Sequence, residues 1–288
     1  MTHLDDARDL RLGAVDMHVH AAPDVKPRVM DAIDVATAAR EAGMRGLVLK
    51  DHAMVTADRA SLAAARVPGV DVVGSITLNR AVGGLNPYAV EAAIRYGARV
   101  VWFPTNTAAS HLRARGKPFG DGLSIFEGGL DAPGRVRREV EEICNLIANA
   151  GVVLATGHLH AVEVAALVPF ARALGVDRVV VTHPENRAVA LDGEGCLAAT
   201  RAGAYLELCY RSTVTGAHVP VAHLAGIVRD VGADRCILAT DLGAADLEPP
   251  ARGMLRFIRE MLGCGIPAVD VSTMVARTPV DLLGLDRR

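Results

Sequence analysis

Four histidines and one aspartate lie at the ends of short apolar segments of the chain. They are His18, His20, His158, His183 and Asp241. Imidazole nitrogens combined with a carboxylate are donors that suit Zn²⁺, and also Mn²⁺, Fe²⁺ or Co²⁺. In an extended segment, residues i and i+2 point to the same side, so His18 and His20 can reach one ion. We therefore predict a divalent metal site built from these five residues, with zinc as the expected ion.

A metal at such a site would make water acidic enough to ionise near neutral pH and would polarise a substrate carbonyl. Asp241 would then take up the proton of the attacking water and later protonate the leaving group. Lys50 and His52 end another apolar segment and are predicted to be catalytic. As an ammonium, Lys50 would bind a substrate carboxylate or the developing oxyanion. His52 would serve as a ligand, as a proton shuttle or as a support for Lys50.

Further polar residues follow the apolar segments and are predicted to bind substrate. They are Arg80, Asn106, His111, Tyr210 and Arg211. Each of them could instead form hydrogen bonds that stabilise a loop. The basic side chains among them, together with Lys50, suggest an anionic small-molecule substrate.

Eight segments rich in Val, Ile and Leu are the elements that must position these residues. They cover 14–20, 45–52, 70–79, 98–105, 152–158, 177–184, 204–210 and 234–243. Such nearly continuous apolar segments are typical of parallel strands that are buried on both faces. Segments with helical spacing of apolar residues alternate with them, at 31–43, 86–98, 135–151, 161–176, 193–204, 221–233, about 250–263 and 267–284.

This alternation predicts an α/β fold, and eight strand–helix units favour a closed (β/α)8 TIM barrel. Residues 1–288 would form one barrel domain, with a long loop after the fourth strand at about 106–134. In such barrels the active site lies at the carboxyl ends of the strands. The predicted ligands all occupy that position, so we expect them to converge.

The HxH pair with a His, a second His and an Asp on strands 1, 5, 6 and 8 resembles the amidohydrolase superfamily. The segments DMHVHAAPD, LVLKDH, LNRAVGGLNP, ATGHL, VTHP and ATDLG are similar to a little-characterised branch of it. The resemblance implies a metal-dependent hydrolase in which His18, His20 and His158 or His183 are ligands. It also implies that Asp241 is both ligand and general base.

The fourth strand departs from the pattern of that superfamily. Members with two metals usually carry a carboxylated Lys or a Glu at its end, but here the sequence is Phe103-Pro104-Thr105-Asn106. The site would then hold one ion, or Lys50 would bridge two ions if it were carboxylated.

The expected activity is hydrolysis of a small polar substrate, at the C–N bond of an amide or cyclic amide. A lactone or a phosphoester is a variant, because the same activated water can attack either. A non-oxidative decarboxylase is the alternative enzyme. A phosphoesterase of the PHP type also begins with HxH, but its additional acidic ligands are missing here. A barrel that binds a metal or metabolite without catalysis is the alternative of another class.

The composition restricts the partners and the location. The net charge is −2 with dispersed charges, and aromatic residues make up 3% of the chain, which argues against a nucleic-acid surface. No apolar run approaches the roughly 20 residues that span a bilayer, and the first residues lack a signal-peptide pattern. The five cysteines are widely spaced, as in reduced proteins. We expect a cytoplasmic homo-oligomer that does not contact membranes.

Overall fold

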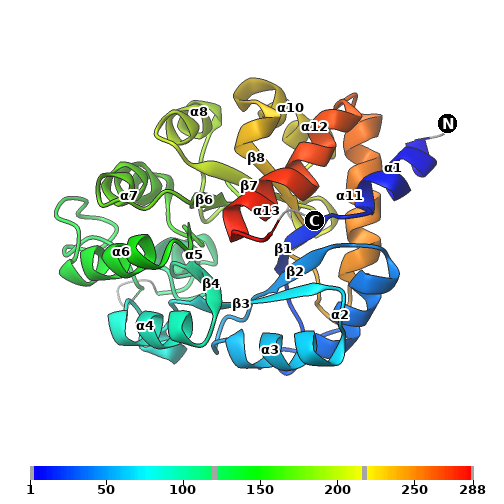
Figure 1. Cartoon of the computed structure of the whole chain (residues 1–288). Coiled ribbons are helices and arrows are strands. Elements are labelled where there is room, and N and C mark those ends of the chain that lie inside the picture. The colour runs from blue at the N-terminus through cyan, green and yellow to red at the C-terminus, as the bar shows by residue number, and fades with distance from the viewer. Residues whose placement is uncertain (1–2, 119–121, 216–218, 287–288) are drawn as a thin grey trace. The chain divides into compact units, whose positions relative to one another are not determined.

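The computed structural model describes residues 3–118, 122–215 and 219–286. Eight strands form one sheet in the order of the chain, and helices alternate with them, which is a (β/α)8 barrel (Figure 1). The strands are β1 (Val15–Val19), β2 (Gly46–Leu49), β3 (Asp71–Thr77), β4 (Ala98–Trp102), β5 (Val153–Ala155), β6 (Val179–Thr182), β7 (Tyr205–Cys209) and β8 (Cys236–Ala239). Each coincides with one predicted segment, so the fold prediction is confirmed.

The α-helices are α1 (His3–Arg11), α2 (Ala32–Glu41), α3 (Ala57–Arg66), α4 (Pro87–Arg95), α5 (Ala109–Ala114), α6 (Arg138–Ala150), α7 (Ala161–Ala173), α8 (Gly193–Arg201), α9 (Arg211–Val214), α10 (Val221–Val231), α11 (Pro250–Gly263), α12 (Ala268–Ser272) and α13 (Thr278–Leu283). A π-helical turn, η3 (Thr273–Arg277), joins the last two, so the single helix expected at 267–284 is interrupted. The short 3-10 turns η1 (Arg80–Val82) and η2 (Ala233–Arg235) complete the set.

The chain divides into two compact units. Unit 1 consists of Met1–Asp51, Thr56–Gly74 and Glu207–Arg288, and unit 2 consists of His52–Val55 and Ser75–Leu206. Unit 1 therefore contains both ends of the barrel sequence, whereas unit 2 contains its middle. That the chain forms one domain stays a prediction from the sequence.

In unit 1, β1 lies beside the end of β8 and beside β2. Val19 pairs with Leu242 in parallel orientation, and the amide of His20 donates to the carbonyl of Leu242 at 2.8 Å. The amide of Asp241 donates to the carbonyl of His18, also at 2.8 Å. On the other side, Val15 of β1 is in register with Gly46 of β2. The backbone thus brings the HxH pair and Asp241 side by side.

The helices of unit 1 bury apolar faces. α11 buries Met254, Phe257, Ile258 and Met261 and contacts α1, which lies beside it (Figure 1). Helix α2 begins as its sequence indicates, because the Asp31 carboxylate accepts from the amides of the second and third residues of the helix, Ile33 and Asp34, at 2.8 Å each.

In unit 2, the parallel strands β4, β5 and β6 continue the sheet, with Val100 opposite Val153 and Leu154 opposite Val179. The long loop expected at about 106–134 contains α5 and is tied down at both ends. Ala108 pairs with Leu123, and Phe126 pairs with Val136. Residues 119–121 of this loop lie outside the described residues.

Glu163 fixes the same loop against the start of α7. Its Oε1 accepts from Ser124 Oγ at 2.7 Å and from the amide of Ile125 at 3.1 Å, and its Oε2 accepts from the amide of His160 at 3.0 Å. The last of these contacts completes a capping box on α7. One buried carboxylate therefore serves both a helix start and a loop.

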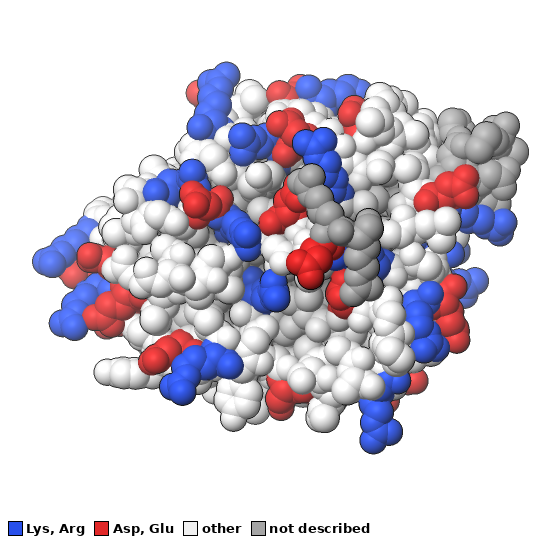
Figure 2. Space-filling view, viewed as in Figure 1, with Lys and Arg blue, Asp and Glu red and all other residues white. Residues whose placement is uncertain are grey.

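Positive and negative side chains are interspersed on one face of the protein (Figure 2). Figure 2 shows Lys and Arg interspersed with Asp and Glu over the face in view. Within the described part of the chain, no helix combines the length and the apolar character needed to cross a bilayer.

Candidate functional site

Three predicted metal ligands meet in unit 1. Asp241 Oδ1 lies 3.1 Å from His18 Nε2 and 3.1 Å from His20 Nε2. The two imidazole rings are tilted by 57°, with centroids 5.4 Å apart. Both histidines are buried, and each residue directs one donor atom to the same point, so this group could hold a metal ion. We call these three residues the His18 cluster.

The backbone at the end of β8 is unusual for the residues it carries. Asp241 has a φ of 51°, in the left-handed region that side chains other than glycine seldom adopt. Gly243 has a φ of 128°, and a Cβ there would collide with the carbonyl oxygen of His20. In this segment Asp241 therefore has a strained backbone, and position 243 must be a glycine because it packs closely against the end of β1.

Asp16 of β1 forms hydrogen bonds with the same segment in the interior of unit 1. Its Oδ1 accepts from the amides of Thr240 at 2.9 Å and His18 at 3.2 Å, and its Oδ2 lies 2.5 Å from Thr240 Oγ1. Complete burial raises the pKa of Asp16 to about 6, although these hydrogen bonds and His18 act to lower it. Asp16 thus links the residue before Asp241 to the first histidine of the HxH pair.

Lys50 and Glu207 flank His18 on opposite nitrogens. Lys50 Nζ lies 3.1 Å from His18 Nε2, and Glu207 Oε2 lies 3.2 Å from His18 Nδ1. Cys209 Sγ lies 3.8 Å from the same Nδ1, so His18, Glu207 and Cys209 form a second group of potential metal donors. Burial lowers the pKa of Lys50, while Asp241 and Glu207 act to raise it. The predicted catalytic lysine therefore directs its amine to the His18 cluster.

The two histidines have pKa values shifted in opposite directions. Burial and Lys50 act to lower the pKa of His18, but Asp241 and Glu207 outweigh them and raise it. Burial lowers the pKa of His20 to about 3 against the effect of Asp241. For Asp241, burial acts to raise the pKa, yet the two histidines hold it well below its usual range. Asp241 is thus an ionised acceptor at neutral pH.

Besides Lys50, two further basic side chains lie around this cluster. Arg28 Nη2 lies 3.2 Å from His20 Nδ1, and Arg28 Nε donates to Asp24 Oδ2 at 2.8 Å. Arg211 Nε lies 3.9 Å from Asp241 Oδ2 and is about a third exposed. Arg211 is therefore placed to meet an anion near Asp241.

Asp16, Asp24 and Arg28 were not predicted from the sequence to belong to the site, and Glu207 was predicted only as a buried structural charge with a basic partner. Asp16 and Glu207 stand inside strands, where an acidic residue in an apolar segment is itself a signal of a buried, paired charge. Asp24 and Arg28 belong to an irregular segment after HxH, and their i,i+4 spacing occurs outside any helix, so no sequence pattern marks them.

In unit 2, three other histidines gather around His158. Its Nδ1 lies 2.8 Å from Nδ1 of His111, and the two rings are stacked at 4.7 Å. The rings of His183 and His52 lie 4.9 Å and 6.3 Å from the ring of His158. His183 also has a positive φ, of 29°. Unit 2 thus brings together two predicted ligands, a predicted catalytic residue and a predicted substrate-binding residue.

Asn79 holds His52 in place. Its Nδ2 donates to the carbonyl of His52 at 2.9 Å and to Thr105 Oγ1 at 2.7 Å, and Thr105 Oγ1 lies 2.8 Å from His52 Nδ1. The Oδ1 of Asn79 accepts from the amides of Thr105 and Thr107. Asn79 therefore links the segments that follow β3 and β4 by hydrogen bonds.

The remaining predicted substrate-binding residues differ in exposure. Arg80 is exposed and Asn106 is half-buried, both in unit 2. Tyr210 of unit 1 is buried, and its ring lies 5.4 Å from that of Phe257 in α11. Tyr210 thus takes part in the core, and its contact with substrate stays a prediction.

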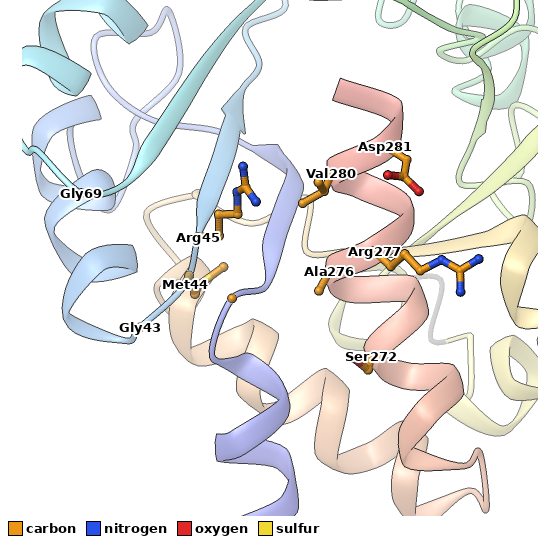
Figure 3. A pocket seen from close by; sticks show the side chains of 10 residues that line it. Gly43, Met44, Arg45, Gly69, Ser272, Ala276, Arg277, Val280 and Asp281 are labelled. Atoms are coloured by element: carbon orange, nitrogen blue, oxygen red, sulfur yellow. The ribbon is translucent and has the colours of Figure 1, made fainter. Parts of the chain in front are cut away.

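A cavity of about 550 Å³ in unit 1 lies away from the His18 cluster. Gly13, Arg45 and Gly69, which precede β1, β2 and β3, line it together with η3 and α13 (Figure 3). It therefore occupies the amino ends of the strands, whereas His18, Lys50 and Asp241 lie at the carboxyl ends, where barrel enzymes carry their chemistry.

Several solved structures similar to this chain bear the names of hydrolases. An amidohydrolase from Pseudomonas aeruginosa is 10% identical, with a TM-score of 0.66 and 98% of each chain covered. A protein assigned as a 2-pyrone-4,6-dicarboxylic acid hydrolase from Pseudomonas putida is 15% identical, with a TM-score of 0.63, over 96% of this chain and 99% of the other. An organophosphorus hydrolase from Deinococcus radiodurans is 14% identical, with a TM-score of 0.60, over 96% and 93%. At these identities the likeness establishes the fold.

The comparison with curated proteins gave no match. A family model matches residues 13–207, which include the HxH pair, Lys50, both histidines at the ends of β5 and β6, and Glu207. Since the match covers more than half of the chain, the protein belongs to the family of unknown function DUF6282.

Proposed function

We propose that this protein is a metal-dependent hydrolase whose metal is held by His18, His20 and Asp241. The observation that carries the proposal is the convergence of three donor atoms, with Asp241 Oδ1 3.1 Å from the Nε2 atoms of both histidines. Two imidazoles and one carboxylate fit a divalent transition metal, with zinc as the first candidate and Mn²⁺, Fe²⁺ or Co²⁺ as alternatives. The burial of both histidine donors fits a specific site rather than a surface cluster.

Such an ion supplies Lewis acidity, because it polarises the reacting oxygen and lowers the pKa of water. Asp241 is ionised and touches both histidines, so it can take up a proton from water and return it to the leaving group. Lys50 Nζ, 3.1 Å from His18 Nε2, can stabilise negative charge that develops on the substrate.

The substrate we propose is a small carboxylated molecule with an amide, cyclic amide or lactone bond. Arg211, close to Asp241 and partly exposed, provides a cation for the carboxylate. The similar structures bear hydrolase names, one of them for a pyrone dicarboxylate, which is a lactone with two carboxylates. These names favour hydrolysis over decarboxylation.

Metal analysis of the purified protein tests the central claim. We expect about one equivalent of a transition metal per chain, and we expect His18→Ala to lose it. The control is His223→Ala, which replaces an exposed histidine of α10 and should retain the metal. Absence of bound metal in the wild-type protein, even after incubation with Zn²⁺, Mn²⁺ or Co²⁺, would refute the proposal.

Two further measurements separate the alternatives. In Asp241→Asn, retention of the metal with loss of hydrolysis would assign Asp241 as the base. Metal binding without turnover of amides, lactones or phosphoesters by the wild-type protein would favour a non-catalytic barrel. The sequence predictions that His158 and His183 bind metal, that the protein forms a homo-oligomer and that it is cytoplasmic stay predictions.

A further inference from the structure

The two histidines of the His18 cluster meet opposite kinds of group at their Nδ1 atoms. For His18 that group is the Glu207 carboxylate, with Oε2 at 3.2 Å and only 1% of the residue exposed. A carboxylate accepts hydrogen bonds, so Nδ1 of His18 carries the hydrogen. Nε2 is then the nitrogen with a lone pair, which can accept from Lys50 Nζ at 3.1 Å, and Asp241 Oδ1 lies 3.1 Å from the same nitrogen. Glu207 therefore prepares His18 as a metal ligand.

For His20 the group at Nδ1 is a guanidinium. Arg28 Nη2 lies 3.2 Å from His20 Nδ1, and a guanidinium has no acceptor. Nδ1 of His20 must therefore accept, and the hydrogen of the neutral ring lies on Nε2. That hydrogen is donated to Asp241 Oδ1 at 3.1 Å. In this arrangement Nε2 of His20 offers no lone pair to a metal.

Arg28 is held in this position by its own partners. Its Nε donates to Asp24 Oδ2 at 2.8 Å, and the side chains of Arg28 and Asp24 are only 4% and 0% exposed. The backbone of Arg28 pairs with Ala244, and the amide of Val29 donates to the carbonyl of Gly243 at 3.0 Å. The guanidinium is thus fixed beside the segment that carries Asp241.

We propose that Glu207 and the Arg28–Asp24 pair are positioning residues with opposite effects on metal binding. Glu207 presents His18 Nε2 to the metal, whereas Arg28 holds His20 as a hydrogen-bond donor to Asp241 and must release Nδ1 before His20 can bind. Arg28 thereby lowers the affinity of the site below what its donors would give. This inference rests on the metal site of the proposed function.

The test compares the affinities of whole-chain variants for Zn²⁺ and Co²⁺, by competition with a chelator. We expect Glu207→Gln to bind at least about tenfold more weakly. We expect Arg28→Met to bind roughly fivefold to tenfold more tightly, because the competing hydrogen bond is removed. Arg28→Lys keeps a donor and a charge and should remain near the wild-type value.

Two additional variants control for effects on metal affinity that do not come from the hydrogen bond between Arg28 and His20. Arg28→Met leaves the Asp24 carboxylate buried without its partner, so the double variant Asp24→Asn/Arg28→Met is measured beside it and should also bind more tightly. Arg45→Met breaks an ion pair with Asp71 at the amino ends of β2 and β3 and should leave the affinity unchanged. The visible spectrum of bound Co²⁺ would show a change in coordination in the two Arg28→Met variants.

The sign of each effect decides the outcome. If Glu207, Arg28 and Asp24 had purely structural roles, their replacement would weaken metal binding in every variant. Weaker or unchanged binding in both variants that carry Arg28→Met, or unchanged binding in Glu207→Gln, would overturn this inference while leaving the metal site intact. Absence of binding by the wild-type protein would instead refute the proposed function.

Discussion

Replacement of Asp16 by Asn should stabilise the protein at neutral pH, although it removes a buried residue with three hydrogen-bond contacts. Asn Oδ1 can still accept from the amides of Thr240 and His18, and its Nδ2 can donate to Thr240 Oγ1. The threonine hydroxyl can in turn donate to the carbonyl of His18, which lies 3.4 Å away. Asn therefore reproduces the protonated form of Asp16 without the cost of a buried charge.

The size of this effect follows from the pKa of Asp16. Burial raises it from 3.8 to about 6 in the folded protein. A group whose pKa is raised on folding contributes stability below its unfolded pKa, and that contribution is lost as the pH rises through the folded pKa. The difference of about 2 units corresponds to about 3 kcal/mol of unfolding free energy lost above about pH 7. By about pH 5 roughly half of this loss has already occurred.

Urea unfolding of wild type and Asp16→Asn at several pH values measures this contribution. We expect Asp16→Asn to be more stable by up to about 3 kcal/mol at about pH 7.5 and by about half of that at about pH 5. Asp16→Ala, which leaves two buried amides without an acceptor, should be less stable than wild type at both values. If Asp16→Asn were destabilising at about pH 7.5, or if its effect did not change with pH, Asp16 would be an ionised structural residue and the reasoning would fail.

Two other substitutions test how the site and the long loop are held. Gly243→Ala should reduce metal affinity at least about tenfold, because the added methyl group collides with the His20 carbonyl and displaces the backbone beside Asp241. Competition with a chelator for the metal measures this affinity, and an affinity equal to that of the wild type would contradict the prediction. Glu163→Ala should lower the unfolding free energy by about 3–5 kcal/mol, because it removes contacts to Ser124, Ile125 and His160 and leaves buried donors unpaired. A loss below about 1 kcal/mol in denaturant unfolding would show that the loop does not depend on this carboxylate.

The strands of the barrel could be predicted because burial on both faces leaves a direct mark on the sequence. Glycines placed before the next strand, such as Gly43 and Gly97 with φ of 72° and 98°, marked where helices end. Helix α3 escaped prediction because Ala and Arg dominate it and its buried residues are all alanines, so no large apolar side chains reveal its face. The helix expected at 267–284 was interrupted by a π turn, which apolar spacing does not reveal.

The convergence of His18, His20 and Asp241 could be predicted, but the surroundings of these residues could not. His18 lies at the end of β1, and His20 and Asp241 follow β1 and β8, so the barrel rule alone brings them to one rim. Glu207 lies inside β7 and contacts His18 across the barrel interior. Arg28 contacts His20 from an irregular segment, and the path of this segment depends on contacts with residues after β8. Such contacts depend on tertiary structure, and local sequence patterns do not encode them.

Backbone strain gives independent support for placing function at the strand ends. Among the described residues other than glycine, three have a positive φ, namely His183, Ala190 and Asp241. Two of these were predicted as metal ligands from residue type and position alone. A side chain in the left-handed region costs about 1–3 kcal/mol, and it persists only where the surroundings impose it. At Asp241 the surroundings are identifiable, because Asp16 holds Thr240 on one side and the glycine at 243 lies against His20 on the other. The strain therefore accompanies the contact that brings one carboxylate oxygen to two imidazoles, as expected if the geometry of this site is selected for chemistry rather than for stability.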